Sequence, residues 1–151
     1  MRIGVCGFPK SGKTSAYPDA RHTDEVMHLQ WSQASDAVAS WFADKDKNLV
    51  VEGATVLRAL RKIRKAGKPC PIDKLVFFCV PLGPLEPHQK SIGGAQANML
   101  LELIDWLPAV ELVVSNVPTK RRPKNRAMVA SLLKWLPAAA ETVHLAMQKA
   151  P

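Results

Sequence analysis

The sequence predicts an α/β fold with three layers, in which helices cover a five-stranded parallel sheet. Short apolar runs alternate with amphipathic helical segments along the chain, and such alternation is typical of parallel strands joined by right-handed crossovers. The apolar run at residues 73–80 (DKLVFFCV) has no polar alternation, so both faces of that strand should be covered. A length of 151 residues suits a single domain, which we place over residues 1–151.

The first strand is expected at residues 2–6 (RIGVC), a short and mostly apolar run that leads into Gly7. A helix should begin at Lys13, but Pro18 limits this helix to barely two turns. Residues 21–24 are expected to form a short second strand.

Two amphipathic helices and a buried strand are predicted in the middle of the chain. The first helix ends near Asp44, and its apolar residues recur at spacings of three and four. Residues 48–52 (NLVVE) form the third strand, because most of their side chains are apolar. The second helix covers residues 54–66 and stops at Gly67. The apolar face of the first helix consists of Trp31, Ala34, Val38, Trp41 and Phe42.

A loop is expected after the fourth strand, over residues 81–94, where prolines break regular structure and glycines extend the loop. The next helix should cover residues 95–107 and stop at Pro108. Residues 110–115 form the fifth strand. A basic loop at residues 119–126 then leads into a helical tail.

Composition is that of an ordinary globular protein, with 47% hydrophobic and 23% charged residues. No apolar run approaches the ~20 residues that a membrane helix needs, and the N-terminal residues do not resemble a signal peptide. We therefore expect a cytoplasmic protein without a membrane partner. The three cysteines have no paired spacing and the four histidines have no metal-ligand spacing, so neither disulfides nor a metal on these residues is indicated.

The formal net charge is +8, with a sequence pI near 9.7. Such a charge favours anionic partners, which include nucleotides and nucleic acids alike. Charge alone does not distinguish between these partners.

A phosphate-binding loop is predicted at residues 7–14, where GFPKSGKT matches G-x-x-x-x-G-K-[ST] at every fixed position. The glycines allow a tight turn that brings backbone N–H groups against phosphate oxygens. The lysine can bridge the β- and γ-phosphates, and the threonine hydroxyl can ligate Mg²⁺. We therefore expect a nucleoside triphosphate, ATP, to bind with Mg²⁺. The nucleotide-binding residues are Gly7, Phe8, Pro9, Lys10, Ser11, Gly12, Lys13 and Thr14.

Two carboxylates are expected near the γ-phosphate, because ligands lie at the carboxyl ends of parallel strands. Glu52 closes the third strand and is a candidate metal ligand acting through water, whereas Asp24 closes the second strand and is placed to orient or deprotonate an acceptor hydroxyl. Alternatively, Glu52 is an acid at a helix N-terminus, and Asp24 is a solvated loop acid with Glu25 as its nearest rival.

Basic residues gather on the helix at residues 54–66 and in the loop at residues 119–126. A solvated face explains most of the first group, but Arg58 lies roughly one turn from the site and is a candidate contact to an anionic substrate. The loop could flank the base, bind nucleic-acid phosphates, or simply be solvated. Core packing, rather than base stacking, is expected of Trp31, Trp41, Trp106 and Trp135.

The motif GFPKSGKT after an N-terminal strand, the strand end at Asp24, and VVEG after a tryptophan-bearing helix together resemble the P-loop kinase group. The segments HTDEVMHLQWSQASDAVASW and EGATVLRALRK also resemble small P-loop proteins of phages and prophages. The kinase resemblance implies the sheet order 2-3-1-4-5 and transfer of the γ-phosphoryl group of ATP to a small acceptor. It implies that Lys13 contacts the phosphates, that Thr14 holds Mg²⁺, and that Glu52 and Asp24 are the site carboxylates.

The chain departs from this group in one respect. Kinases of the group generally close an arginine-bearing lid over the phosphates, whereas the candidate lid at residues 82–94 contains Lys90 and His88 but no arginine. The first hypothesis is a Mg²⁺-dependent kinase acting on an anionic or hydroxyl-bearing small molecule. The alternatives are a nucleotide-dependent ATPase that binds nucleic acid, and a nucleotide-binding module without turnover.

Overall fold

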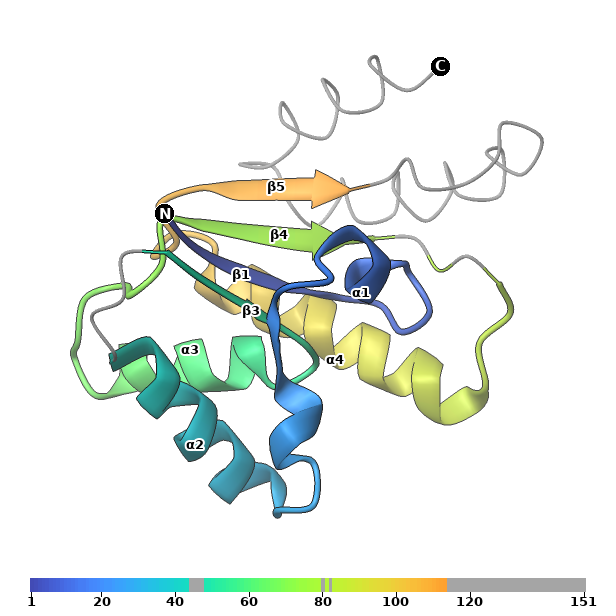
Figure 1. The fold of residues 1–151 in the computed structure, drawn as a ribbon, viewed down its shortest axis with the longest axis horizontal. Helices are drawn as coiled ribbons and strands as arrows, with labels where there is room; N and C mark the ends of the chain where they lie inside the picture. The colour runs from blue at the N-terminus through green and yellow to red at the C-terminus, as the bar shows by residue number, and fades with distance from the viewer. Residues whose placement is uncertain (44–47, 80, 82, 114–151) are drawn as a thin grey trace.

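The computed structural model describes residues 1–43, 48–79, 81 and 83–113, and Figure 1 shows its fold. Five strands form one sheet in the order β2-β3-β1-β4-β5, and every neighbouring pair is parallel. The predicted fold class and the implied strand order are therefore confirmed. The strands are β1 (Arg2–Gly7), β2 (Arg21–His22), β3 (Leu49–Glu52), β4 (Lys74–Phe78) and β5 (Val110–Val113).

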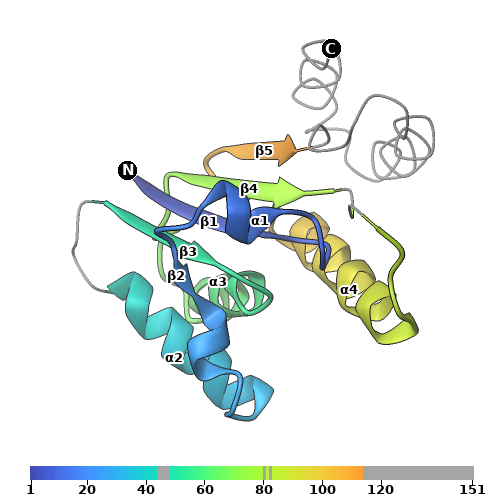
Figure 2. The same cartoon turned by 45° about the vertical axis from the view of Figure 1, so that its right-hand side comes forward.

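The longer helices lie together on one side of the sheet, with α3 between α2 and α4, and the short helix α1 lies on the opposite side (Figures 1 and 2). This arrangement places the larger hydrophobic core between the sheet and α2, α3 and α4. The helices are α1 (Lys13–Ala16), the 3₁₀ turn η1 (Thr23–Val26), α2 (Trp31–Ala43), α3 (Val56–Lys65) and α4 (Pro87–Leu103).

Strand β4 is buried on both faces, as its continuous apolar run predicts. Successive side chains of a strand point to opposite faces. Accordingly, Leu75 and Phe77 join the larger core, whereas Val76 and Phe78 join a second cluster on the other face with Val5. The neighbouring Tyr17 ring meets Phe78 edge-on, with ring centroids 6.4 Å apart.

Helix α4 begins at Pro87, so the expected loop over residues 81–94 and helix start at residue 95 are wrong. The helix start is a capping box, in which the Glu86 backbone N–H donates to Gln89 Oε1 over 2.9 Å. A proline fits the first turn of a helix, because the N–H that it lacks has no partner there. Helix α4 ends at Leu103, four residues earlier than expected.

Helix α1 and strand β2 are shorter than predicted. Helix α1 is one turn rather than nearly two. Strand β2 ends at His22, so Asp24 lies in the turn η1 and does not close the strand. The expected end of the fifth strand at residues 114–115, the basic loop at residues 119–126 and the helical tail lie outside the described residues.

The tryptophans differ in their surroundings. Trp41 is 8% exposed and belongs to the larger core, and Trp106 packs against that core, both as predicted. Trp31 is 42% exposed, so the expectation that it is a core residue is wrong. As the first residue of α2, Trp31 lies at the helix end. Trp135 is outside the described residues.

The cysteines are free thiols, as their spacing predicts. Burial raises the pKa of the Cys79 thiol to about 12 and raises the pKa of Cys6 further. Both side chains therefore behave as small hydrophobic groups. In the described part of the chain, no helix is both long enough and apolar enough to cross a membrane.

Candidate functional site

The loop between β1 and α1 lies at the carboxyl edge of the sheet (Figure 1). Gly7 has a φ of 125°, and a Cβ atom there would collide with the Phe78 backbone, so glycine is required. Lys10 and Gly12 also have positive φ values, of 54° and 84°. Alternating left-handed residues turn successive N–H groups toward one concave side, which is the geometry of an anion-binding nest.

The Lys13 side chain folds back over this loop. Its Nζ donates hydrogen bonds to the Phe8 carbonyl over 2.6 Å and to Ser11 Oγ over 3.2 Å. Burial lowers the pKa of the Lys13 ammonium, while the nearby charges of Glu52 and Asp24 act in the opposite direction. The ammonium is thus held at the concave side of the loop, where phosphate oxygens can replace the Phe8 carbonyl as its acceptors.

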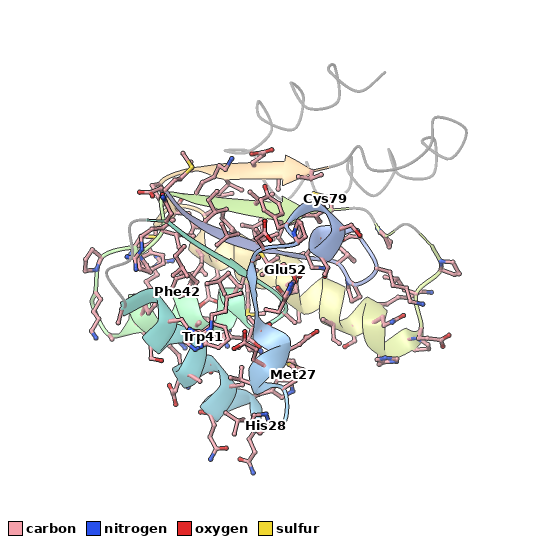
Figure 3. The ribbon with its side chains drawn as sticks, in the orientation of Figure 1. Met27, His28, Trp41, Phe42, Glu52 and Cys79 are labelled. Carbon is pink, nitrogen blue, oxygen red and sulfur yellow. The ribbon has the colours of Figure 1, made fainter. Side chains whose placement is uncertain are left out.

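Glu52 is the buried carboxylate of the site. It is 5% exposed at the end of β3, and Figure 3 shows its side chain near the carboxyl edge of the sheet. Its Oε2 accepts hydrogen bonds from Thr14 Oγ1 over 3.4 Å and from His22 Nδ1 over 2.6 Å. Glu52 lies four residues before α3, whose first turn contains no acidic residue, and its described hydrogen bonds go to Thr14 and His22 instead.

His22 is a residue of the site that the sequence analysis missed. The parallel ladder pairs His22 with Glu52, so the two side chains project from neighbouring strands on the same face of the sheet. A sequence signal exists in retrospect, because both residues are the last of adjacent strands. This signal can be used only when the last residue of β2 and the register of β2 against β3 are known.

The remaining predicted residues, Asp24 and Arg58, differ in their contacts. Asp24 is exposed in η1, and its charge acts on Lys13. The Arg58 guanidinium lies over the ring of Trp31, 4.7 Å from its centroid. The structure therefore brings Lys13, Thr14, Glu52 and His22 together, and it brings Arg58 against an exposed aromatic ring instead.

Three other basic residues of α3 are engaged with neighbouring helices. Lys62 Nζ lies 2.7 Å from Asp36 Oδ1 on α2, and Arg61 Nη1 lies 3.5 Å from Glu102 Oε2 on α4. Arg64 Nη1 donates to the backbone carbonyl of Glu102. Much of this basic face therefore links α3 to its neighbours rather than being merely solvated.

Helix α4 supports the loop at residues 7–14 through Phe8. The Phe8 ring packs edge-on against Phe77, with centroids 6.4 Å apart, and it also covers the backbone of Gly93. A Cβ atom at Gly93 would overlap the Phe8 ring. The carbonyl of Phe8 accepts hydrogen bonds from Ser11 Oγ and Lys13 Nζ, so a displacement of Phe8 would disturb the loop.

We therefore expect Gly93→Ala to lower ATP affinity by about tenfold or more, corresponding to about 1.4 kcal/mol of lost binding free energy. The matched control is Gly94→Ala, because a Cβ atom at Gly94 meets nothing within 4 Å. Both changes remove a glycine from the interior of a helix, which by helix propensity favours α4 by up to ~1 kcal/mol, but at Gly93 the overlap with the Phe8 ring opposes this gain. Calorimetric titration and thermal unfolding of both variants test this, and equal ATP affinities would contradict it.

The donor set suits Mg²⁺. The Thr14 hydroxyl and the Glu52 carboxylate are hard oxygen donors 3.4 Å apart. Among the described residues, no group of three or more His, Cys, Asp or Glu side chains could hold a metal ion. Mg²⁺ needs no such cage, because it is usually bound by one or two protein oxygens together with waters and substrate phosphates.

Comparisons with protein-family models, with curated proteins and with solved structures gave no match to this chain.

Proposed function

We propose that this chain is an ATP-binding, Mg²⁺-dependent kinase that transfers the γ-phosphoryl group to a small acceptor. One observation carries the proposal, namely the Glu52 carboxylate 3.4 Å from the hydroxyl of Thr14, beside a loop that matches the phosphate-binding motif. A buried acid against the motif threonine has little use in a purely structural turn. It is the arrangement that a metal-bound triphosphate requires.

Each site residue has one role in the proposed reaction. The loop N–H groups and Lys13 hold the phosphates and neutralise charge that develops during transfer. Thr14 and Glu52 would hold Mg²⁺, Glu52 through water. Mg²⁺, when bound, screens the negative charge of the β- and γ-phosphates. Asp24 orients the attacking hydroxyl or accepts its proton.

The acceptor is a small molecule with a hydroxyl or anionic group. The net charge of +8 supports an anionic ligand. Arg58 is the proposed contact to this ligand, and Trp31 beneath it offers an exposed ring. We further propose that the protein acts in the cytoplasm.

A nucleotide-binding module without turnover is the second candidate. The absence of arginine from residues 82–94 favours it, as does the start of α4 at Pro87, which leaves little chain for a lid. A nucleic-acid-dependent ATPase has less support, because Lys62 and Arg61 are already paired with acids. The basic loop at residues 119–126 is outside the described residues.

The test is a measurement of ADP release from ATP and Mg²⁺ with a panel of small hydroxyl-bearing and anionic acceptors. Acceptor-dependent release supports the kinase. Release stimulated by DNA or RNA, with steep salt dependence, supports the nucleic-acid-dependent ATPase. ATP binding without release under any condition supports the module without turnover.

Arg58→Ala is expected to raise the acceptor KM or lower kcat by about tenfold while barely changing ATP affinity, because the guanidinium contacts the acceptor rather than the phosphates. Arg61→Ala, one turn further along α3, is the matched control and should leave acceptor turnover and ATP affinity unchanged.

The double change Arg121→Ala and Arg122→Ala should also leave acceptor turnover intact. A nucleic-acid binder would instead bind more weakly with this double variant, and its log-affinity against log-salt slope would shrink by about 0.9 for each duplex phosphate that the two arginines neutralise.

A further inference from the structure

We propose that His22 is a positioning residue, which holds the Glu52 carboxylate in the orientation that faces bound Mg²⁺. This inference rests on the proposed function, because it assigns His22 to the same metal site. The observation that carries it is the contact of 2.6 Å between His22 Nδ1 and Glu52 Oε2. This contact is shorter than the 3.4 Å contact between Thr14 Oγ1 and the same oxygen.

The contact follows from the register of the sheet. His22 and Glu52 are Cα partners in the parallel ladder between β2 and β3, so their side chains leave the sheet side by side. The flanking residues of His22 are directed elsewhere. Arg21 lies over the Trp41 ring at 3.8 Å, and Thr23 is buried against Gly53. His22 is therefore the side chain of this segment that reaches the carboxylate.

The hydrogen bond runs from the imidazole to the acid, because an ionised carboxylate only accepts hydrogen bonds. Glu52 is 5% exposed, and burial of a carboxylate is costly unless hydrogen-bond donors satisfy its oxygens. A glutamate has several rotatable side-chain bonds, and two donors on one oxygen restrict them. Oε2 is thereby kept against Thr14, where the water shell of Mg²⁺ would meet it.

The His22 side chain is 30% exposed and, within the described part of the chain, its ring nitrogen Nδ1 is committed to Glu52. We therefore assign it a role through Glu52, rather than a contact with the reacting atoms. Partners that orient a direct metal ligand typically contribute 10- to 100-fold to metal affinity. Because Glu52 would act through water, we expect the effect of His22 to lie at the lower end of this range.

The experiment measures ATP affinity by calorimetry with Mg²⁺ and, separately, with EDTA. The ratio of the two affinities gives, for each variant, the gain in ATP affinity that is due to Mg²⁺. His22→Ala should reduce this gain by about tenfold or more and leave ATP affinity in EDTA unchanged. His22→Asn should retain most of the gain, because its amide can donate from about the position of Nδ1. His28→Ala is the matched control, since His28 is exposed and lies well apart from Glu52 (Figure 3).

A double-mutant cycle with Glu52→Gln tests whether His22 acts through that carboxylate. In the Glu52→Gln background, His22→Ala should cause no further loss of the Mg²⁺ gain. An undiminished gain in His22→Ala, an equal loss in His22→Asn and His22→Ala, or an additive loss in the double variant would each overturn the inference. Wild-type protein that binds no ATP even in EDTA would instead overturn the proposed function, and the inference with it.

Discussion

Replacing Lys13 by alanine is expected to weaken ATP binding by about tenfold to a hundredfold and to leave the fold intact. The ammonium is a charged donor held at the concave side of the phosphate-binding loop, and hydrogen bonds to charged groups contribute roughly 1.5–3 kcal/mol. Its present acceptors are the Phe8 carbonyl and the Ser11 hydroxyl. These belong to the loop and not to the hydrophobic core, so the free energy of unfolding should change little.

Lys10→Ala is the matched control for this variant. Lys10 belongs to the same loop, but its side chain is exposed and, among the described residues, its Nζ donates to the Pro84 carbonyl over 3.5 Å. Its removal preserves the backbone of the loop and should change ATP affinity by no more than about threefold, or less than about 1 kcal/mol. Calorimetric titration of both variants, with thermal unfolding as the check on folding, decides the matter. Equal ATP affinities of Lys13→Ala and wild type would refute the phosphate-binding assignment.

The fold class could be predicted from the sequence because its signals are local and repeated. The run DKLVFFCV required a strand buried on both faces, and the alternation of strands and helices required parallel pairing. The loop predicted over residues 87–94 was wrong because the sequence of this segment carries opposing signals. Proline and glycines favoured a loop, whereas the side chains of Glu86 and Gln89 supplied the cap that starts α4.

Gly93 shows why a local signal can mislead. A glycine within a helix costs up to ~1 kcal/mol relative to alanine, so its presence argued against helix. The structure shows why a glycine stands at position 93, since the Phe8 ring occupies the space that a Cβ atom would need. Such a reason depends on a residue far away in the sequence.

The candidate site was predictable where residues are consecutive, and less so where strands meet. The motif at residues 7–14 is recognised from its own consecutive residues, and Glu52 was found as a strand end. His22 depends on the register between β2 and β3, which no local pattern specifies. For Arg58, the helical rise gave the distance along α3, but the direction of the side chain is set by Trp31 on another helix.

Glu52→Gln is expected to reduce Mg²⁺-dependent turnover by about a hundredfold and to preserve ATP affinity in EDTA within about threefold. Removal of a group that stabilises developing charge typically costs 10²–10³ in kcat. The substitution keeps the size of the side chain and one oxygen that can accept from Thr14 or His22, so packing at the end of β3 should survive. In the proposed site the charge of Glu52 acts through Mg²⁺ and not on the base or ribose, so binding without metal should be spared.

The control for the lost charge is Glu25→Gln. Glu25 is an exposed acid of η1, and its Oε2 lies 3.4 Å from Arg21 Nε, so its neutralisation changes the net charge equally but leaves the phosphate site alone. ADP release with Mg²⁺, and calorimetry with Mg²⁺ or EDTA, should separate the two variants. Turnover at the wild-type rate in Glu52→Gln would mean that the buried carboxylate serves to hold β2 and Thr14 against β3. The metal would then have to be held by Thr14 and the phosphates alone.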